Sequence, residues 1–260
     1  LTPRDSEQVS KILRFCNEET IAVVPQGGNT GSVASGIPNG EIILSLEKMN
    51  NIISIIPEDY SITVESGCIL SQVQDAAHEA SRFFPLSIGS EGSCTIGGNI
   101  STNAGGISVL KYGNMRDLVL GLEVVLADGR IMNNLKRLRK DNSGYATKHM
   151  FMGAEGTLGV ITAACLRLFP KIENKVTAFA SLSNLDATIQ LLETLKCFSG
   201  EVLSSSELIP FTSGFVILSN GSNIIETTYS MHSSQVFFST HTDVLSLKCS
   251  FFHNGALCLR

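Results

Sequence analysis

The spacing of apolar residues predicts an amphipathic helix at the start of the chain, followed by a series of short strands. Asp5 and Gln8 form the capping-box pattern of a helix N-terminus, and the apolar residues after them recur on one helical face. Short runs rich in β-branched residues predict strands over 21–24, 42–46, 52–56 and 62–65, and a second helix is expected around 73–80. We therefore predict a small α/β unit that ends near Pro85.

The remainder of the chain shows longer strands first and an irregular pattern later. Strands are expected over 118–127 and 160–169, and Asp128-Gly129 after the first is typical of a two-residue hairpin turn, so this unit should be partly antiparallel. From residue 176 a strand, a helix and a strand are expected over 176–181, 186–197 and 201–205. Residues 211–260 have no sustained period, and only 214–218 suggests a further strand.

Three glycine-rich loops follow predicted strands, at residues 27–31, 97–106 and 153–159. In the segment 95–106, two glycine pairs are separated by small polar residues, a composition that is unfavourable for a helix or a strand. A run of exposed backbone N–H groups suits an anion such as a diphosphate, whereas an ordinary turn is the alternative for any single loop. Together the three loops predict a cradle for an extended ligand with a diphosphate at its middle.

Composition and charge exclude several other classes of protein. With 260 residues and 43% hydrophobic content, the chain is expected to form one large or two small soluble domains, and its apolar runs are far shorter than the ~20 residues of a membrane-spanning helix. The net charge is −5, and the basic cluster 136–140 is too short for nucleic-acid binding, so we expect a solvated loop there. Seven cysteines without C-x-x-C spacing argue against a disulfide framework and a zinc site, and they favour a reducing compartment.

The three loops, in this order and at this spacing, resemble those of the vanillyl-alcohol-oxidase superfamily, whose FAD-binding domain is of the p-cresol-methylhydroxylase (PCMH) type. The segments that carry the resemblance are 25–31, 92–106 and 153–161. Within that superfamily, 121–129 and 139–145 are most similar to D-2-hydroxyglutarate dehydrogenase and its D-lactate and glycolate dehydrogenase relatives.

The resemblance implies an α+β fold: a PCMH-type FAD-binding domain over 1–175, with subdomains of about 1–88 and 89–175, followed by an incomplete α/β cap. Residues 176–210 would begin the cap, and 211–260 would be a divergent tail. FAD would bind non-covalently, because Asn29 stands where covalent members often carry histidine. The residues implied to hold FAD are Gly27, Gly28, Asn29, Thr30 and Gly31, then Gly97, Gly98, Thr102, Asn103, Ala104 and Gly105, and finally Glu155, Gly156, Gly159 and Ile161.

The resemblance also implies a reaction, which this chain is expected to support only in part. The relatives oxidise small D-2-hydroxyacids, D-2-hydroxyglutarate to 2-oxoglutarate among them, and pass electrons to an acceptor such as an electron-transfer flavoprotein or a quinone in mitochondria. The histidine-rich cap segment of such relatives has no counterpart here, and His232, His241 and His253 fit no metal motif, so no metal site and no catalytic residue are identified. The chain is therefore interpreted as a C-terminally truncated form.

Alternatives remain open at this point. The chain could be a non-catalytic, flavin-binding truncation product, or a different FAD oxidase of the same fold, such as an aldonolactone oxidase. Cys94 is interpreted as a packed residue rather than a flavin attachment point, and Tyr112 and Tyr145 as core aromatics rather than flavin contacts.

Overall fold

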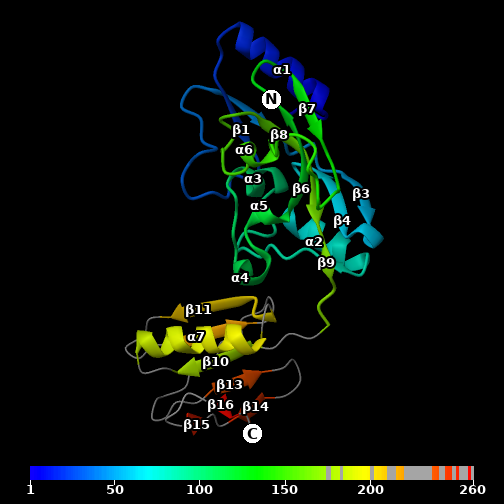
Figure 1. Cartoon of the computed structure of the whole chain (residues 1–260). Coiled ribbons are helices and arrows are strands. Elements are labelled where there is room, and N and C mark those ends of the chain that lie inside the picture. The colour runs from blue at the N-terminus through cyan, green and yellow to red at the C-terminus, as the bar shows by residue number, and fades with distance from the viewer. Residues whose placement is uncertain are drawn as a thin grey trace. The chain divides into compact units, whose positions relative to one another are not determined.

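The computed structural model in Figure 1 describes residues 1–173, 177–181, 184–199, 202–209, 215–219, 236–239, 244–247, 250–251 and 257–258. The chain divides into two compact units. Unit 1 comprises Leu1–Gly106 and Gly113–Lys171, and unit 2 comprises Ile107–Tyr112 and Ile172–Arg260.

Unit 1 is an α+β assembly whose strands form a five-stranded antiparallel sheet and two smaller sheets. Its helices are α1 (Ser6–Glu18), η1 (Pro57–Asp59, a 3-10 turn), α2 (Leu70–Glu79), α3 (Ile96–Ser101), α5 (Met115–Leu118) and α6 (Lys148–Phe151). Its strands are β1 (Val23–Gln26), β2 (Ile42–Ser45), β3 (Ile52–Ile56), β4 (Ser61–Glu65), β5 (Arg82–Phe83), β6 (Val119–Val125), β7 (Ile131–Asn134), β8 (Val160–Arg167) and β9 (Phe169–Pro170). Strands β1 and β2 are parallel, β5 pairs with β9, and the large sheet has the order β3-β4-β8-β6-β7.

The large sheet combines strands from both sides of the predicted subdomain boundary near residue 88. Strand β4 pairs antiparallel with β8, from Ser61 opposite Arg167 to Glu65 opposite Ala163, so segments about 100 residues apart in the sequence lie side by side. Local patterns predicted each strand but not its partner, because pairing between distant strands is decided by burial of their apolar faces.

Helix α1 begins where the sequence predicts and for the predicted reason. The Asp5 carboxylate accepts a hydrogen bond from the Gln8 backbone N–H at 2.7 Å, and the Gln8 side chain accepts one from the Arg4 N–H at 3.0 Å. Local side chains thus satisfy N–H groups that a helix end leaves without partners. The helix buries Val9, Leu13 and Cys16, as its apolar spacing requires.

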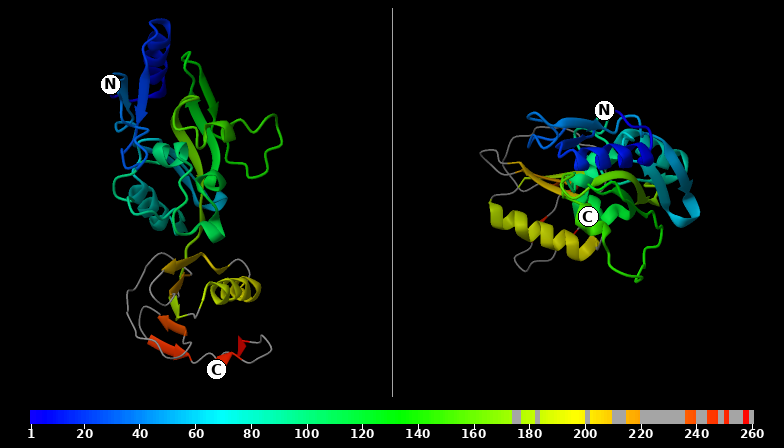
Figure 2. Two further views of the ribbon diagram at one scale, coloured as in Figure 1. Left: turned by 90° about the vertical axis from the view of Figure 1, so that its left-hand side faces the viewer. Right: turned by 90° about the horizontal axis from the view of Figure 1, so that it is seen from above.

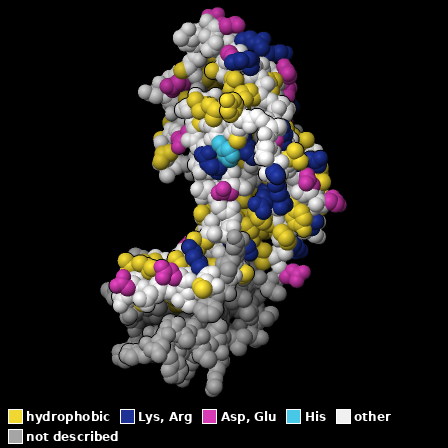
Figure 3. All heavy atoms as spheres, viewed as in Figure 1, with side chains coloured by type: hydrophobic (Ala, Val, Ile, Leu, Met, Phe, Trp, Pro, Cys, Tyr) yellow, Lys and Arg dark blue, Asp and Glu magenta, His cyan; other side chains and the backbone are white. Residues whose placement is uncertain are grey.

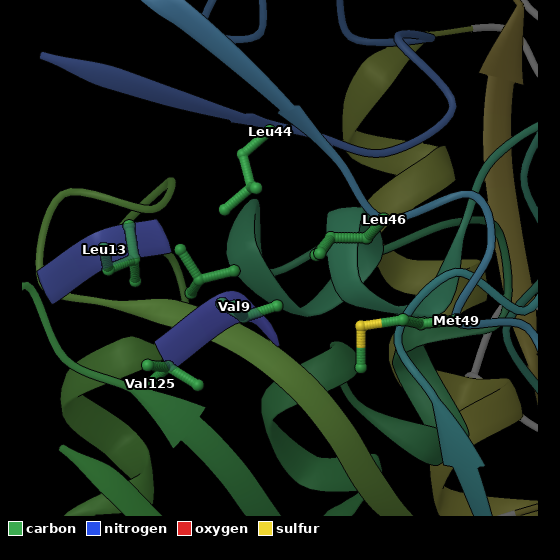
Figure 4. Close-up of a cluster of buried hydrophobic side chains, with 7 residues drawn as sticks. Val9, Leu13, Leu44, Leu46, Met49 and Val125 are labelled. Carbon is green, nitrogen blue, oxygen red and sulfur yellow. The ribbon is translucent and has the colours of Figure 1, made fainter. Parts of the chain in front are cut away.

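A cluster of aliphatic side chains fixes α1 and the β1–β2 pair against the large sheet. Figure 4 shows Leu44 of β2 directed into the same space as Val9 and Leu13 of α1. The buried members of this cluster are Val9, Leu13, Leu44, Leu46, Met49, Val125 and Val160. Burial of each such side chain stabilises the fold by roughly 1.5–3 kcal/mol, so this cluster holds the end of β1 in place.

The hairpin between β6 and β7 has a three-residue loop, which corrects the predicted two-residue turn. Leu126 accepts a backbone hydrogen bond from Gly129 N at 2.9 Å and donates one to Arg130 O at 2.9 Å. Gly129 has φ 82°, which closes a turn followed by a bulge. The Asp-Gly pair predicted the hairpin correctly, but the loop also includes Ala127. Beyond the loop and its flanking residues, the first paired residues of the two strands are Val125 and Ile131.

Unit 2 contains the predicted strand–helix–strand series, and both strands of that series belong to a second antiparallel sheet. Its elements are α4 (Val109–Tyr112), β10 (Thr177–Ser181), α7 (Leu185–Ser199), β11 (Ser205–Ile209), β12 (Phe215–Ser219), β13 (Val236–Ser239), β14 (Val244–Leu247), β15 (Ser250–Phe251) and β16 (Leu257–Cys258). The sheet order is β11-β12-β10-β13-β14, and β15 pairs with β16. Strand β11 lies four residues later than predicted, and β12 matches the strand suggested at 214–218. The strands after β12 lie where the sequence predicted no fold.

Some sequence predictions cannot be compared with the structure. His232, His241 and His253 lie outside the described residues. Within the described part of the chain, no helix combines the length and apolar character needed to cross a membrane.

Candidate functional site

The three glycine-rich loops of unit 1 lie around one cleft at the end of β1. The cleft has a volume of about 240 Å³, far more than a single buried water requires. It is lined by residues of the first loop and its continuation (25–31, 35, 36), of α3 and its approach (88, 90, 94, 95, 97–99, 101, 102, 104), of the third loop (155, 156, 159–161), and by Leu46 and Ser66. The sequence prediction that these loops converge on one site is thus matched by their placement.

Glycine is required in the first loop because this loop lies directly against the segment before α3. A Cβ atom on Gly28 would overlap the carbonyl oxygen of Ser93 and lie 3.1 Å from the Cα of Cys94. A Cβ on Gly27 would overlap the Thr95 hydroxyl. Gly31 differs from both, since a Cβ there would meet no atom within 4 Å. Two glycines therefore permit close packing, and the third borders open space in the cleft.

The second loop begins as a helix, which corrects the prediction that its glycines would prevent one. Helix α3 spans Ile96–Ser101, and the Thr95 hydroxyl caps it by accepting from the Gly98 N–H at 3.4 Å. Gly97 lies so close to β4 that a Cβ would come within 2.7 Å of the Ser66 Cβ. The cost of glycine in a helix is roughly 1 kcal/mol, and burial of Ile96 and Ile100 offsets it.

The third loop completes a ring of contacts among the three. Its Gly153 and Glu155 N–H groups donate to the carbonyls of Ile100 and Ser101 at 3.2 and 3.0 Å. On its other side, a Cβ on Gly156 would lie 2.7 Å from Pro25 in β1. Each loop therefore contacts the other two, and the shape of the cleft depends on all three.

The hydrogen-bonding groups that face the cleft come mainly from the first loop. Among the described residues, no acceptor pairs with the backbone N–H groups of 27–31, and Asn29 has the left-handed φ of 49° typical of anion-binding nests. By contrast, the N–H groups of Ile96 and Gly97 already donate to Cys68 and Ser66 carbonyls, at 2.9 and 2.7 Å. An anion in the cleft would therefore meet the first loop's N–H groups rather than that of Gly97.

The cleft carries little side-chain charge and one unpaired hydroxyl. Glu155 is the only charged residue among those that line it, and no lysine, arginine or histidine does so. The Oγ atom of Ser66, a residue that is only 1% exposed, has no hydrogen-bond partner in the described structure. A buried polar atom without a partner is costly, so this site fits a ligand that brings its own polar groups.

All of the predicted cofactor residues line this cleft except Asn103 and Gly105. Asn103 instead contacts α5: it has φ 50°, and its side chain accepts a hydrogen bond from the Arg116 N–H at 2.9 Å. Residues that sequence analysis missed include Gln26, Leu46, Ser66 and Ile88. Gln26 adjoins the first motif and could have been included, whereas Ser66 reaches the cleft only through β4–β8 pairing, which no local pattern reveals.

The predicted roles of three further residues have different outcomes. Cys94 is 2% exposed and receives a hydrogen bond from the Asn99 amide at 3.5 Å, in agreement with a packed residue. Tyr145 is 94% exposed, so its interpretation as a core aromatic is wrong: it lies in the loop between β7 and α6. Tyr112 is half-buried in α4 of unit 2, and burial raises the pKa of its hydroxyl.

Known proteins are similar to this chain in sequence and in fold. A model of the FAD binding domain family matches residues 1–134. The mitochondrial D-2-hydroxyglutarate dehydrogenase of Danio rerio is 47% identical over 213 residues, which are 80% of this chain and 39% of that protein. The corresponding protein of Bos taurus is 45% identical over 210 residues, with the same coverage. The chain thus spans about two fifths of the length of these relatives.

A solved structure supplies the fold comparison. A structure of alkyldihydroxyacetonephosphate synthase superposes with a TM-score of 0.71 at 17% identity, over 84% of this chain and 46% of that one. The predicted α+β fold of the FAD-binding PCMH type is therefore confirmed. Since the family match covers more than half of the sequence, the chain belongs to the FAD binding domain family.

Proposed function

We propose that unit 1 binds FAD non-covalently in the cleft formed by the three loops. The observation that carries this proposal is the row of backbone N–H groups at 27–31, which lack acceptors among the described residues and stand at the end of a strand. A diphosphate would accept hydrogen bonds from them. The family match and the unpaired Ser66 hydroxyl support the same ligand.

The walls of the cleft fit the other parts of an FAD molecule. Leu46, Val160 and Ile161 are buried apolar residues in the lining of the cleft, suited to contact with an aromatic ring. Thr102 and Ser101 bring hydroxyl groups from the end of α3, suited to the ribityl or ribose hydroxyls. The Glu155 carboxylate can accept hydrogen bonds from sugar hydroxyls, while its charge disfavours a phosphate beside it.

We further propose that the whole protein is an FAD-dependent dehydrogenase of D-2-hydroxyacids, with D-2-hydroxyglutarate as substrate and 2-oxoglutarate as product. The relatives that are 45–47% identical carry the name of that activity. Bound FAD would supply the acceptor for a hydride from the α-carbon of the hydroxyacid. Mitochondrial location and a separate electron acceptor, an electron-transfer flavoprotein or a quinone, belong to the same proposal.

The described residues that line the cleft offer groups for cofactor binding but not for catalysis. Oxidation of a hydroxyacid requires a base for the hydroxyl proton and cations for the carboxylate. Among the described residues that line the cleft, only Glu155 is ionisable apart from the Cys94 thiol. We propose that unit 2 is the beginning of a cap domain, with its boundary near residue 175, and that this chain binds FAD without appreciable turnover.

Two measurements on the purified chain test these proposals separately. We expect FAD titration to quench flavin fluorescence with saturation at one FAD per chain, and the absence of any quenching would refute the FAD site. We expect no oxidation of D-2-hydroxyglutarate or D-lactate with an artificial electron acceptor. Turnover by this chain would show that its residues do include a complete substrate site.

The lack of cations in the cleft predicts that FAD affinity depends only weakly on salt. Between 50 and 500 mM NaCl, we expect the Kd for FAD to change by less than about threefold, because N–H dipoles at short range are screened much less than exposed ion pairs. The melting temperature of the FAD-free chain, measured at both salt concentrations, controls for effects on the fold. A loss of affinity of tenfold or more would indicate that lysine or arginine side chains contact the phosphates.

A further inference from the structure

A group of arginine side chains surrounds Tyr60 at the end of the large sheet away from the FAD cleft. Arg82 and Arg139 both lie over the Tyr60 ring, with guanidinium carbons 4.3 and 5.8 Å from its centroid. Arg167 is the last residue of β8, where it pairs with Ser61 of β4. Thr162, at the cleft end of β8, is five residues away, which corresponds to roughly 17 Å along the strand.

Arg167 lacks the partners that a partly buried guanidinium requires. Its Nε atom is buried without a hydrogen-bond partner, and its guanidinium lies over the Phe169 ring at 4.5 Å. Arg139 lies over the Tyr60 ring, and the residues next to Tyr60 and Arg167 hold the two segments together: Arg167 pairs with Ser61, and the Leu168 N–H donates to the Tyr60 carbonyl at 2.7 Å. Burial, and then the charge of Arg139, lower the pKa of Arg167. Like charges held together in this way are destabilising unless an anion lies between or beside them.

The acidic residues of this region do not supply that anion. Asp59 forms an ion pair with Arg137 at 3.7 Å and accepts from the Ser61 hydroxyl at 3.4 Å. Glu58, the other acidic residue of η1, is exposed and forms no ion pair with either arginine in the described structure. Arg82 is held by the carbonyls of Pro57 and Ser81. Within the described chain, Arg139 and Arg167 therefore have no carboxylate or carbonyl acceptor.

Two ion pairs anchor the base of the loop that carries Arg139. Lys136 forms an ion pair with Asp141 at 2.7 Å, and Arg137 reaches η1. Figure 2 (left) shows this segment, between β7 and α6, extending from the sheet, and Figure 3 shows Lys and Arg side chains gathered on the face of unit 1 turned to the viewer. Residues 137–140 are exposed, as expected of a solvated loop.

We propose that Arg139 and Arg167, stacked on Tyr60 and Phe169, form a binding site for a small oxyanion, a carboxylate or a phosphate. The anion would accept hydrogen bonds from the buried Nε of Arg167 and from the guanidinium of Arg139, in the bidentate geometry that arginine favours. Carboxylate and phosphate share this chemistry. The site lies apart from the FAD cleft and does not depend on the proposed function.

Succinate and inorganic phosphate are the probes that test this site, each added to the whole chain at constant ionic strength set with NaCl. We expect at least one of them to raise the melting temperature, by about 3–5 °C at ten times its Kd. The change should disappear in Arg139→Gln and in Arg167→Gln. Arg4→Gln removes an equally exposed positive charge elsewhere and should keep the full response.

Each outcome either identifies the class of the bound anion or overturns the proposal. A response to succinate alone assigns a carboxylate, and a response to phosphate alone assigns a phosphate. A response that survives both arginine substitutions would place the anion elsewhere, including the FAD cleft, and would overturn the proposal. So would the lack of any response in the unmodified chain. Arg139 is exposed, so its substitution leaves the fold intact even if Arg167→Gln alters stability.

Discussion

Replacing Gly28 with alanine is expected to weaken FAD binding by about 100-fold or more. The new Cβ would overlap the Ser93 carbonyl oxygen, a backbone atom that no side-chain rotation can move. The first loop would have to shift away from α3, and its N–H groups would lose their common direction. Loss of two hydrogen bonds to a charged group, at about 1.5 kcal/mol each, corresponds to a Kd raised by about two orders of magnitude. Fluorescence titration with FAD measures this directly.

Two other glycines separate a steric effect from a general intolerance of alanine. Gly89 has open space around it and lies outside the cleft lining, so Gly89→Ala should bind FAD as the unmodified chain does. Gly31→Ala should leave the melting temperature of the FAD-free chain unchanged, yet it should weaken FAD binding because its methyl group enters the cleft. Full affinity in Gly28→Ala would show that the first loop is not fixed against Ser93.

Replacing Leu44 with alanine is expected to reduce the free energy of unfolding by about 2–5 kcal/mol. Leu44 is fully buried in the cluster that joins β2 to α1, and it pairs with Pro25, at the end of the strand that delivers the first loop. The cavity left by its side chain would remove contacts from Val9 and Leu13 (Figure 4). Urea denaturation followed by circular dichroism gives the change.

Leu138→Ala serves as the matched control, because Leu138 is 63% exposed in the loop between β7 and α6. Its substitution should change stability by less than about 0.5 kcal/mol. If Leu44→Ala destabilised the chain by no more than Leu138→Ala, the cluster around Leu44 would not be a rigid core. Because β1 depends on this cluster, Leu44→Ala should also weaken FAD binding near its lowered melting temperature.

The sequence predicted elements whose stability is local and failed where distant contacts decide. Helix α1 was predicted from Asp5 and Gln8 because its cap is made by neighbours in the sequence. Helix α3 was not, because the cost of Gly97 and Gly98 is offset by contacts with Ser66 and the core, which lie outside the segment. The hairpin at Gly129 was predicted, but its loop length depends on which residues of β6 and β7 pair.

The same distinction applies to the two sites. The glycines of the cleft could be predicted because they lie in three short motifs, although only the first motif directly follows a strand and the third follows helix α6. The arginine group could not, because Arg82, Arg139 and Arg167 are separated by tens of residues and meet only through the β4–β8 ladder and the β7–α6 loop. Asn103 was assigned to the cofactor because it lies within a motif, although its side chain supports α5 instead.

Because the three loops contact one another, the substitutions that one loop tolerates depend on the residues present in another loop. A side chain at Gly27 would need a smaller residue than Thr95 opposite it, whereas Gly156, with φ 80°, would stay strained with any side chain even if Pro25 were replaced. Changes at Gly27 and Thr95 should therefore be strongly non-additive, harmful singly and tolerated together. Redesign of this cleft for a different ligand would have to alter residues of at least two loops in the same step.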